Sequence, residues 1–241
     1  MPELRIGTAG WSVPAGAAAA FPEEGTSLER YSARFRCGEI NSSFHRSHRQ
    51  ATWERWAASV PDDFRFAVKL PKTITHGLRL SDAEALVGAF LAEIAPLGDK
   101  AAVILVQLPP SLAFDAAVAP GFFARLAAAT DAQIACEPRH PSWFEEEADA
   151  LLTGRKVARV AADPARVEAA AVPGGWRGMR YYRLHGSPIP YRSSYEPERL
   201  AGYAAAIRAD LEQSRPVWCI FDNTASSAAT GNALDLQAML G

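Results

Sequence analysis

Short apolar runs alternate with longer segments along the whole chain, and each run ends in a polar or ionisable residue. The runs cover residues 4–8, 37–41, 64–69, 102–107, 133–139, 156–163, 179–185 and 216–223. Most of the intervening segments are long enough for a helix, so the pattern predicts eight strand-then-helix units. Eight such units are typical of a (β/α)8 TIM barrel, an α/β fold in which functional residues lie at the carboxyl ends of the strands.

Helix-start signals support this division of the chain. Thr26 or Ser27 can cap a helix that follows the first strand, and Ser81 and Glu84 have the spacing of a capping box before another helix. The segment 164–177 is rich in proline and glycine, and it predicts only a short helix.

An open doubly wound sheet is the alternative fold, but it favours a GxGxxG turn after the first strand. Gly7-Thr8-Ala9-Gly10 does not match that turn. No low-complexity linker interrupts the sequence. We therefore expect one domain over residues 1–241.

Composition narrows the function classes without selecting one. A net charge of −2 gives no general attraction to nucleic acid or to an anionic membrane. No apolar run reaches the roughly 18 residues of a membrane span, and the start of the sequence has no secretory signal. The three cysteines lie inside predicted strands and outside any CxxC pair, which is typical of reduced, buried thiols. We expect a cytoplasmic protein without a membrane partner.

Polar residues at the strand ends form the candidate site. Alternate residues of a strand share one face, so Glu39 pairs with Asn41, and Arg183 pairs with His185. Buried charges cost several kcal/mol each, so a purely structural plug at this end would more readily be apolar. The predicted ligand-binding residues are Asn41, His76, Gln107, Arg139, His140, Trp143, Asp163, Arg183, Tyr195, Asp222 and Asn223.

Binding of an anion is the simplest function for the cationic residues at the strand ends. Arginine forks suit the oxygens of phosphate or carboxylate groups, and Lys69, Arg139 and Arg183 all end strands. The expected partner is an anionic small molecule or a nucleic-acid fragment. Aromatic residues near the strand ends, including Phe44 and Tyr191, could stack on a ring of such a ligand.

Catalysis at the same site would use general acid–base chemistry, most simply hydrolysis. The predicted catalytic residues are Glu39 and Glu137 as base and orienting group, His185 as proton donor, and Lys69, which together with Arg183 would stabilise developing negative charge. Lys69 could instead form a Schiff base with a carbonyl substrate. The alternative class is a non-catalytic ligand- or nucleic-acid-binding protein.

Metal chemistry is a further alternative. Glu39, Glu137, Asp163 and His185 could hold a divalent ion, which would give a metal-assisted phosphodiesterase. No HxH or HExxH motif is present, and nearby cations would oppose a metal ion. We therefore predict neither a metal nor another cofactor.

Several motifs, in order along nearly the whole chain, resemble those of the DUF72 family, also called YecE-like or UPF0759 proteins. The matching segments are Gly7–Trp11, Glu39–Phe44, Val68-Lys69 with Thr75-His76, Gln107–Pro110, Glu137–His140 with Ser142-Trp143, Arg183–Gly186, and Phe221–Thr224 with Asn232-Ala233. The resemblance implies a TIM-barrel fold and no settled activity. The family more often has Asn at the position of Asp222 and Tyr at that of His45, so Asp222 adds a charge.

Overall fold

The computed structural model describes residues 3–241, in which the strands form two sheets. The first sheet contains, in spatial order, β1 (Leu4–Thr8), β10 (Val217–Phe221), β9 (Arg180–Leu184) and β7 (Ala161–Asp163). The second contains β2 (Cys37–Ile40), β3 (Arg65–Lys69), β4 (Ala101–Gln107), β5 (Gln133–Glu137), β6 (Val157–Arg159) and β8 (Gly174–Gly175). Neighbouring strands are parallel except for the short β6–β8 pair.

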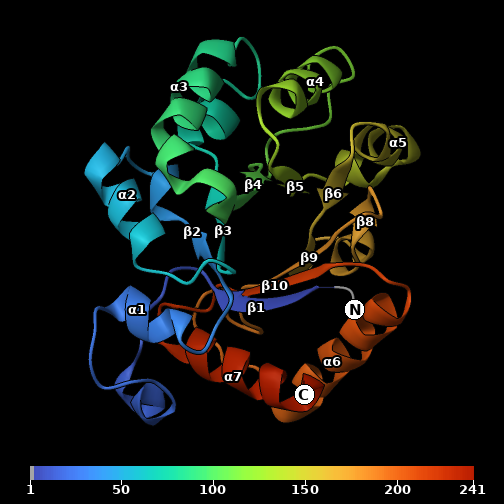
Figure 1. Ribbon diagram of the computed structural model, residues 1–241. Helices are drawn as coiled ribbons and strands as arrows, with labels where there is room; N and C mark the ends of the chain where they lie inside the picture. Colours follow the sequence, from blue (N-terminus) through green and yellow to red (C-terminus); the bar gives the residue numbers. More distant parts are fainter. Residues whose placement is uncertain (1–2) are drawn as a thin grey trace.

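Two junctions connect the sheets into the ring of strands seen in Figure 1. The predicted sixth strand forms but divides at Val160, so that β6 pairs with β5 while β7 pairs with β9. On the other side of the ring, an isolated bridge joins Ala9 to Glu39, and Gly10 N donates to Glu39 O at 2.8 Å. All eight predicted strands are present, which confirms the barrel-type α/β fold class.

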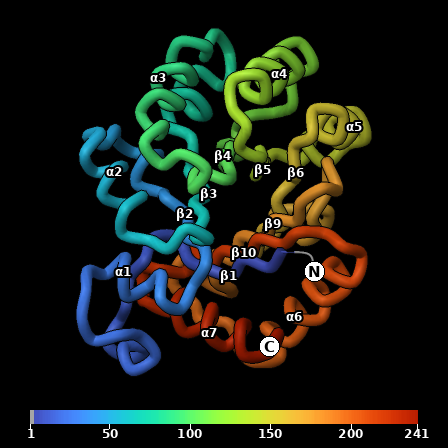
Figure 2. The backbone as a smooth tube through the Cα atoms, in the orientation of Figure 1, coloured from blue at the N-terminus to red at the C-terminus, as the bar shows by residue number. Residues whose placement is uncertain are grey.

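Helices cover the outside of the ring (Figure 1). They are α1 (Ser27–Ser32), α2 (Gln50–Ala58), α3 (Glu84–Ile94), α4 (Ala119–Ala129), α5 (Glu146–Gly154), α6 (Pro197–Glu212) and α7 (Ala228–Leu240). Shorter helical turns are η1 (Ala15–Ala20), η2 (Ser42–Phe44), the π-helical η3 (Thr73–Gly77), η4 (Ala95–Lys100), η5 (Pro141–Phe144) and η6 (Glu168–Ala171). The last helix, α7, lies beside the start of the chain (Figure 2), where Thr230 Oγ1 donates to Ser12 O at 2.9 Å. None of the helices within residues 3–241 combines the length and apolarity that a membrane span requires.

Of the two predicted helix caps, one forms. Thr26 Oγ1 accepts from Glu29 N, and Glu29 Oε2 accepts from Thr26 N, which completes a capping box. The capping box predicted at residues 81–84 is wrong, because α3 begins after Ala83 without a side-chain cap. The chain turns there through Asp82 in a left-handed conformation (φ 48°). After β7 only the short η6 forms, as the proline and glycine content predicts.

Side chains along the strands alternate between two hydrophobic clusters. Phe66 and Val68 belong to the large cluster between strands and helices, whereas Ala67 belongs to a smaller cluster of strand residues inside the ring. Leu105 and Tyr181 share this inner cluster. Because strand residues alternate in direction, the inner face continues at the carboxyl ends with polar residues. They are Glu39, Lys69, Gln107, Glu137, Arg183 and Asp222.

Candidate functional site

Arg183 lies at the centre of a buried charged group on the inner face of the ring. Its side chain is 0% exposed and contacts carboxylates from three different strands. The guanidinium donates to Glu39 from Nε and Nη2 at 3.0 and 2.6 Å, to Asp222 from Nη2 at 2.9 Å, and to Glu137 from Nη1. Burial alone would lower the pKa of Arg183, but these carboxylates raise it well above its usual value.

We call this group the central network and define it as Glu39, Glu137, Arg183, His185 and Asp222. Sequence reasoning identified all five residues. Their meeting follows from strand geometry, because each lies on an inward-facing position near a strand end. A buried carboxylate without a partner costs several kcal/mol, so Arg183 holds together a group that would otherwise repel itself.

Glu39 is the carboxylate of the central network that binds Arg183 through both of its oxygens. Its side chain is fully buried, and both oxygens accept from Arg183. Oε2 also accepts from the hydroxyl of Tyr181 at 2.9 Å. Burial, and then the charge of Glu39, raise the pKa of Tyr181 well above its usual value, so this hydroxyl stays protonated as a donor. Glu39 therefore positions Arg183 and has no face open to a substrate.

His185 bridges two carboxylates. Nδ1 lies 3.0 Å from Asp222 Oδ2, and Nε2 lies 3.3 Å from Glu137 Oε1. Ionised carboxylates only accept hydrogen bonds, and a neutral imidazole has one N–H, so the doubly protonated ring satisfies both contacts. Burial would lower the pKa of His185, but Glu137 and the hydrogen bond to Asp222 raise it. His185 is therefore a cation that can donate a proton.

Glu137 is saturated by cations. Besides Arg183 and His185, Arg139 donates to Glu137 Oε1 from Nε at 3.1 Å and from Nη2 at 3.0 Å. Burial would raise the pKa of Glu137, but Arg183, His185 and Arg139 lower it well below its usual value. Arg139 Nη2 also donates to the Tyr191 hydroxyl at 3.3 Å. Its Nη1 donates to no acceptor among residues 3–241 and is free for a ligand.

Lys69 lies at the end of β3 beside the central network and is buried without an ion pair among residues 3–241. Its Nζ lies 4.1 Å from the centre of the Phe44 ring. Burial, and then the charge of Arg183, lower the pKa of Lys69 to about 8, although three carboxylates oppose this shift. Within the described part of the chain, the ammonium group of Lys69 thus lacks a carboxylate partner, and an anionic ligand could supply one.

His76, in η3, packs against the same Phe44 ring, with 5.0 Å between ring centres. Its Nδ1 is 2.9 Å from the Thr75 hydroxyl. Burial, followed by the charges of Lys69, Arg139 and Lys72, lowers the pKa of His76. Three cationic side chains, Lys69, Arg139 and Lys72, therefore lie near His76 on this side of the strand ends.

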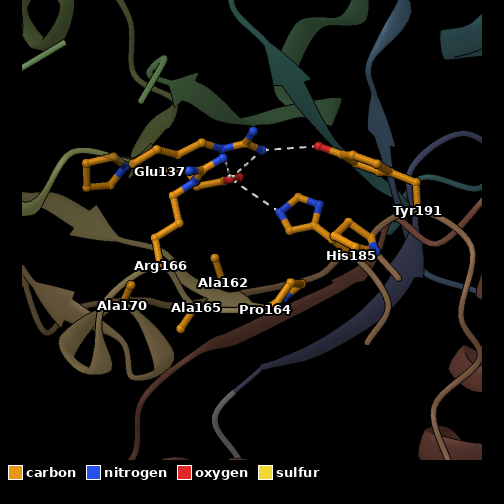
Figure 3. Close-up of a pocket in the computed structure, with 11 residues that line it drawn as sticks. Glu137, Ala162, Pro164, Ala165, Arg166, Ala170, His185 and Tyr191 are labelled. Atoms are coloured by element: carbon orange, nitrogen blue, oxygen red, sulfur yellow. Dashed lines mark hydrogen bonds and ion pairs between the residues drawn. The ribbon is translucent and has the colours of Figure 1, made fainter. Parts of the chain in front are cut away.

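A pocket of about 290 Å³ opens next to the central network, between the ends of β5, β7 and β9. Figure 3 shows Glu137, His185 and Tyr191 facing it, with Ala162 at its floor. The lining residues are Glu137, Pro138, Arg139, Ala162, Pro164, Ala165, Arg166, Ala170, His185, Pro190 and Tyr191. Small pockets with a few converging polar groups are the usual form of ligand sites.

Three predicted site residues instead belong to a second group, which we call the lateral network and define as Asp163, Tyr195, Arg199, Asn223 and Asn232. Asp163 points outward, where Arg199 of α6 binds its Oδ1. Asn223 Nδ2 donates to Asn232 Oδ1 at 2.8 Å, and the same oxygen accepts from Tyr195 N at 3.0 Å. The structure does not bring Asp163, Tyr195 or Asn223 into the pocket.

The position of Asp163 follows from the register of β7. Asp163 is opposite Leu184, and Ala162 is opposite Arg183. Leu184 packs in the outer cluster, whereas Arg183 points inward. The inward position at the end of β7 is therefore occupied by an alanine, and its small side chain leaves space for the pocket.

Four further predicted residues, Asn41, Gln107, His140 and Trp143, do not line the pocket. Asn41 Nδ2 reaches Asp222 Oδ1 at 3.4 Å, and Gln107 is buried with its amide donating to Leu108 O at 3.2 Å. His140 caps η5, where its Nδ1 accepts from Ser142 N. Trp143 lies in the outer hydrophobic cluster, and its indole N–H donates to Leu112 O at 3.0 Å. Their geometry makes His140 and Trp143 supports of the local fold.

Sequence reasoning missed Arg166 and named Tyr191 only as an aromatic residue that could stack on a ligand ring. Both lie on loops, and no periodicity indicates which way a loop side chain points. The backbone of Tyr191 has a left-handed conformation (φ 67°).

Within residues 3–241, no three His, Cys, Asp or Glu side chains are grouped as metal ligands. The carboxylates of the central network surround the guanidinium of Arg183. This donor set does not fit a divalent ion, because a second cation at that place would meet strong repulsion.

The chain is similar in sequence to UPF0759 proteins from two bacteria. The chain is 34% identical to the UPF0759 protein YecE of Escherichia coli K12 over 158 residues, which cover 60% of this chain and 55% of YecE. It is 22% identical to the UPF0759 protein YunF of Bacillus subtilis over 244 residues, covering 88% of this chain and 86% of YunF. The match thus spans about half the length of YecE and most of YunF.

Solved structures support the fold. A DUF72 family protein from Enterococcus faecalis superposes with a TM-score of 0.83 at 19% identity, covering 98% of this chain and 95% of that one. Another from Thermotoga maritima gives a TM-score of 0.78 at 24% identity, with 99% of each chain covered. The sequence profile of the family described as "Protein of unknown function DUF72" matches residues 5–241. The chain therefore belongs to the DUF72 family.

Proposed function

We propose that this chain binds a small molecule bearing a phosphate or carboxylate group in the pocket at the ends of β5, β7 and β9. Arg139 carries the proposal. Its carboxylate partner, Glu137, is already matched by Arg183 and His185, so the positive charge of Arg139, which lines the pocket, has no carboxylate of its own in the described part of the chain. Its Nη1 also makes no hydrogen bond among residues 3–241. Guanidinium N–H groups of this kind form strong, charge-assisted hydrogen bonds to oxyanions.

Calorimetric titration with inorganic phosphate and acetate tests this proposal. We expect Arg139→Ala to weaken binding of the preferred anion by about tenfold, the value of one charge-assisted hydrogen bond. Arg177→Ala is the matched control, because Arg177 is exposed and does not line the pocket. Equal affinity of the Arg139→Ala variant and the unaltered protein would contradict the proposal. A short single-stranded oligonucleotide in the same assay tests the nucleic-acid alternative.

We further propose hydrolysis with His185 as the general acid. His185 lines the pocket, and its two carboxylate contacts keep it protonated. Glu137 orients the imidazolium through Nε2 and is a weak base, because its pKa is lowered. Glu39 contributes through Arg183, a positioning role in place of the predicted role as base. Proton donation from a positioned group typically contributes 10²–10⁴-fold to a rate.

A panel of p-nitrophenyl phosphate, bis-p-nitrophenyl phosphate and p-nitrophenyl acetate tests this step. We expect His185→Gln to lower kcat by roughly a hundredfold or more. Binding without product from the unaltered protein would instead support the non-catalytic alternative. The buried, unpaired state of the three cysteines supports a cytoplasmic location for either function.

Lys69 favours a second candidate reaction, Schiff-base formation with an anionic carbonyl compound. The amine is buried over Phe44 and has no ion pair within residues 3–241, and its pKa of about 8 leaves part of it neutral near physiological pH. The imine forms from the amine and the carbonyl carbon with loss of water. Borohydride reduction during incubation with pyruvate should trap an adduct that Lys69→Met cannot form. Absence of an adduct in the unaltered protein contradicts this candidate.

A further inference from the structure

The pocket contains a second arginine whose role the proposed function leaves open. Arg166, in the loop after β7, lines the pocket together with Arg139. Figure 3 shows Arg166 extending towards Glu137, with Tyr191 on the other side of His185. Arg139 Nη2 donates to the Tyr191 hydroxyl. Among residues 3–241, the guanidinium of Arg166 has neither an ion pair nor a hydrogen bond. Both arginines therefore have unused donors at one cavity.

The charges at the pocket are unequal. Its lining has three cationic groups, Arg139, Arg166 and His185, and a single carboxylate, Glu137. Behind the lining, Arg183 is matched by Glu39, and Asp222 binds both Arg183 and His185. Together with Lys69, which lies beside the central network without an ion pair among residues 3–241, these groups leave two positive charges unmatched, and a monoanionic ligand would match only one of them.

The remaining walls are apolar. They consist of three prolines and three alanines, whose side chains offer no hydrogen bonds to hydroxyl groups of a ligand: Pro138, Pro164, Pro190, Ala162, Ala165 and Ala170. The volume of about 290 Å³ lies at the small end of ligand pockets. These walls suit a compact organic group without many polar substituents.

We propose that the ligand is a phosphomonoester with a compact, largely apolar organic group, held between Arg139 and Arg166. This inference rests on the proposed anion site and specifies its substrate class. A phosphomonoester carries close to two negative charges at pH 7 and has three strong acceptor oxygens. Two guanidinium groups can share these oxygens, and the Tyr191 hydroxyl can donate to one of them once Arg139 turns to the ligand. A carboxylate supplies one charge and two oxygens.

Phenyl phosphate and phenyl sulfate separate charge from shape, because the two molecules are nearly isosteric but differ by one charge. Titration at pH 7.5 and low salt should show phenyl phosphate binding about tenfold more tightly than phenyl sulfate. Arg166→Ala should remove this preference by weakening phenyl phosphate alone, and Arg177→Ala should leave it intact. Benzoate serves as the carboxylate probe and should bind more weakly than phenyl phosphate.

The outcomes distinguish this inference from the proposed function. Equal binding of phenyl phosphate and phenyl sulfate, or a preference for benzoate, would overturn the phosphomonoester assignment while loss of binding in Arg139→Ala still supported the anion site. A phosphate preference that survives in Arg166→Ala would also overturn it. Failure of all three probes to bind would overturn both proposals. Circular dichroism of each variant shows whether the fold is retained.

Discussion

The central and lateral networks lie near the same end of the strands but differ in what surrounds them. The central network faces inward, concentrates charge around Arg183 and borders a pocket. The lateral network faces the helix layer, where Asp163 binds Arg199 of α6 and Asn232 of α7 holds the backbone at Tyr195. The first has the cationic donors that a ligand needs, and the second fixes the loop between β9 and α6.

Adjacent residues separate the two networks. Ala162 faces the pocket while Asp163 faces α6, and Asp222 contacts Arg183 while Asn223 contacts Asn232. A shift of one residue along a strand exchanges its two faces. Polarity at a strand end is therefore insufficient to identify a functional residue, and direction relative to the ring decides its role.

Arg183→Met should give the largest effect, because it leaves three buried carboxylates without their shared cation. Breaking a buried ion pair from one side costs about 3–5 kcal/mol. We expect a loss of that size in the free energy of unfolding, measured by urea denaturation. Arg177→Met, at an exposed arginine, should change it by less than about 0.5 kcal/mol. A loss below about 1 kcal/mol for Arg183→Met would show that the central network is not held by this residue.

Lys69→Met should stabilise the protein and weaken anion binding. The folded-state pKa of about 8 lies below the usual 10.5, so protonated Lys69 destabilises the fold below pH 8, and this cost disappears as pH rises towards 10.5. Its removal should add on the order of 2–3 kcal/mol at pH 7. Urea denaturation and phosphate titration measure the two effects. A Lys69→Met variant that is less stable than the unaltered protein would contradict this prediction and show that Lys69 stabilises the fold.

Asn232→Ala should affect the lateral network alone. It removes acceptors and donors for Tyr195 N, Tyr195 O and Asn223 Nδ2, at a cost of about 1–3 kcal/mol in stability. Phosphate affinity should fall by less than about threefold, because Arg139 lies outside this network. Gln237→Ala, on the same helix, is the control. Complete loss of phosphate binding would show that the two networks are not separable.

The change of the unfolding free energy with pH should be the smallest of these effects. The pKa of His185 is raised from 6.5, so its contribution to stability is complete below pH 6.5 and is lost as pH rises through the folded-state pKa. The slope is at most roughly 1.4 kcal/mol per pH unit. For Glu137 and Asp222, with lowered pKa values, the contribution is lost at the acid end. In the His185→Gln variant, the unfolding free energy measured across pH should no longer show the loss of stability above pH 6.5 that His185 causes. It should keep the loss at acid pH that Glu137 and Asp222 cause.

Local sequence patterns were sufficient to predict the eight strands, their order and the residues of the central network. These features depend on local patterns, since apolar alternation fixes which residues of a strand share a face. A helix cap at Thr26 or Ser27 was likewise predicted from the residues that follow, and Thr26 forms it. Glu39, Glu137, Arg183 and Asp222 were recognisable because charged residues are unusual at the end of a buried strand.

The direction of the side chains in the sixth strand and the position of the pocket depend on tertiary packing. Residues 157–162 are nearly all small and apolar on both faces, so their pattern cannot tell that Ala162 points inward and Asp163 outward. Arg166 and Tyr191 reach the pocket from loops, whose direction depends on packing against distant elements. The ion pairs join strands far apart in the sequence, and the closure of the ring brings their charges together.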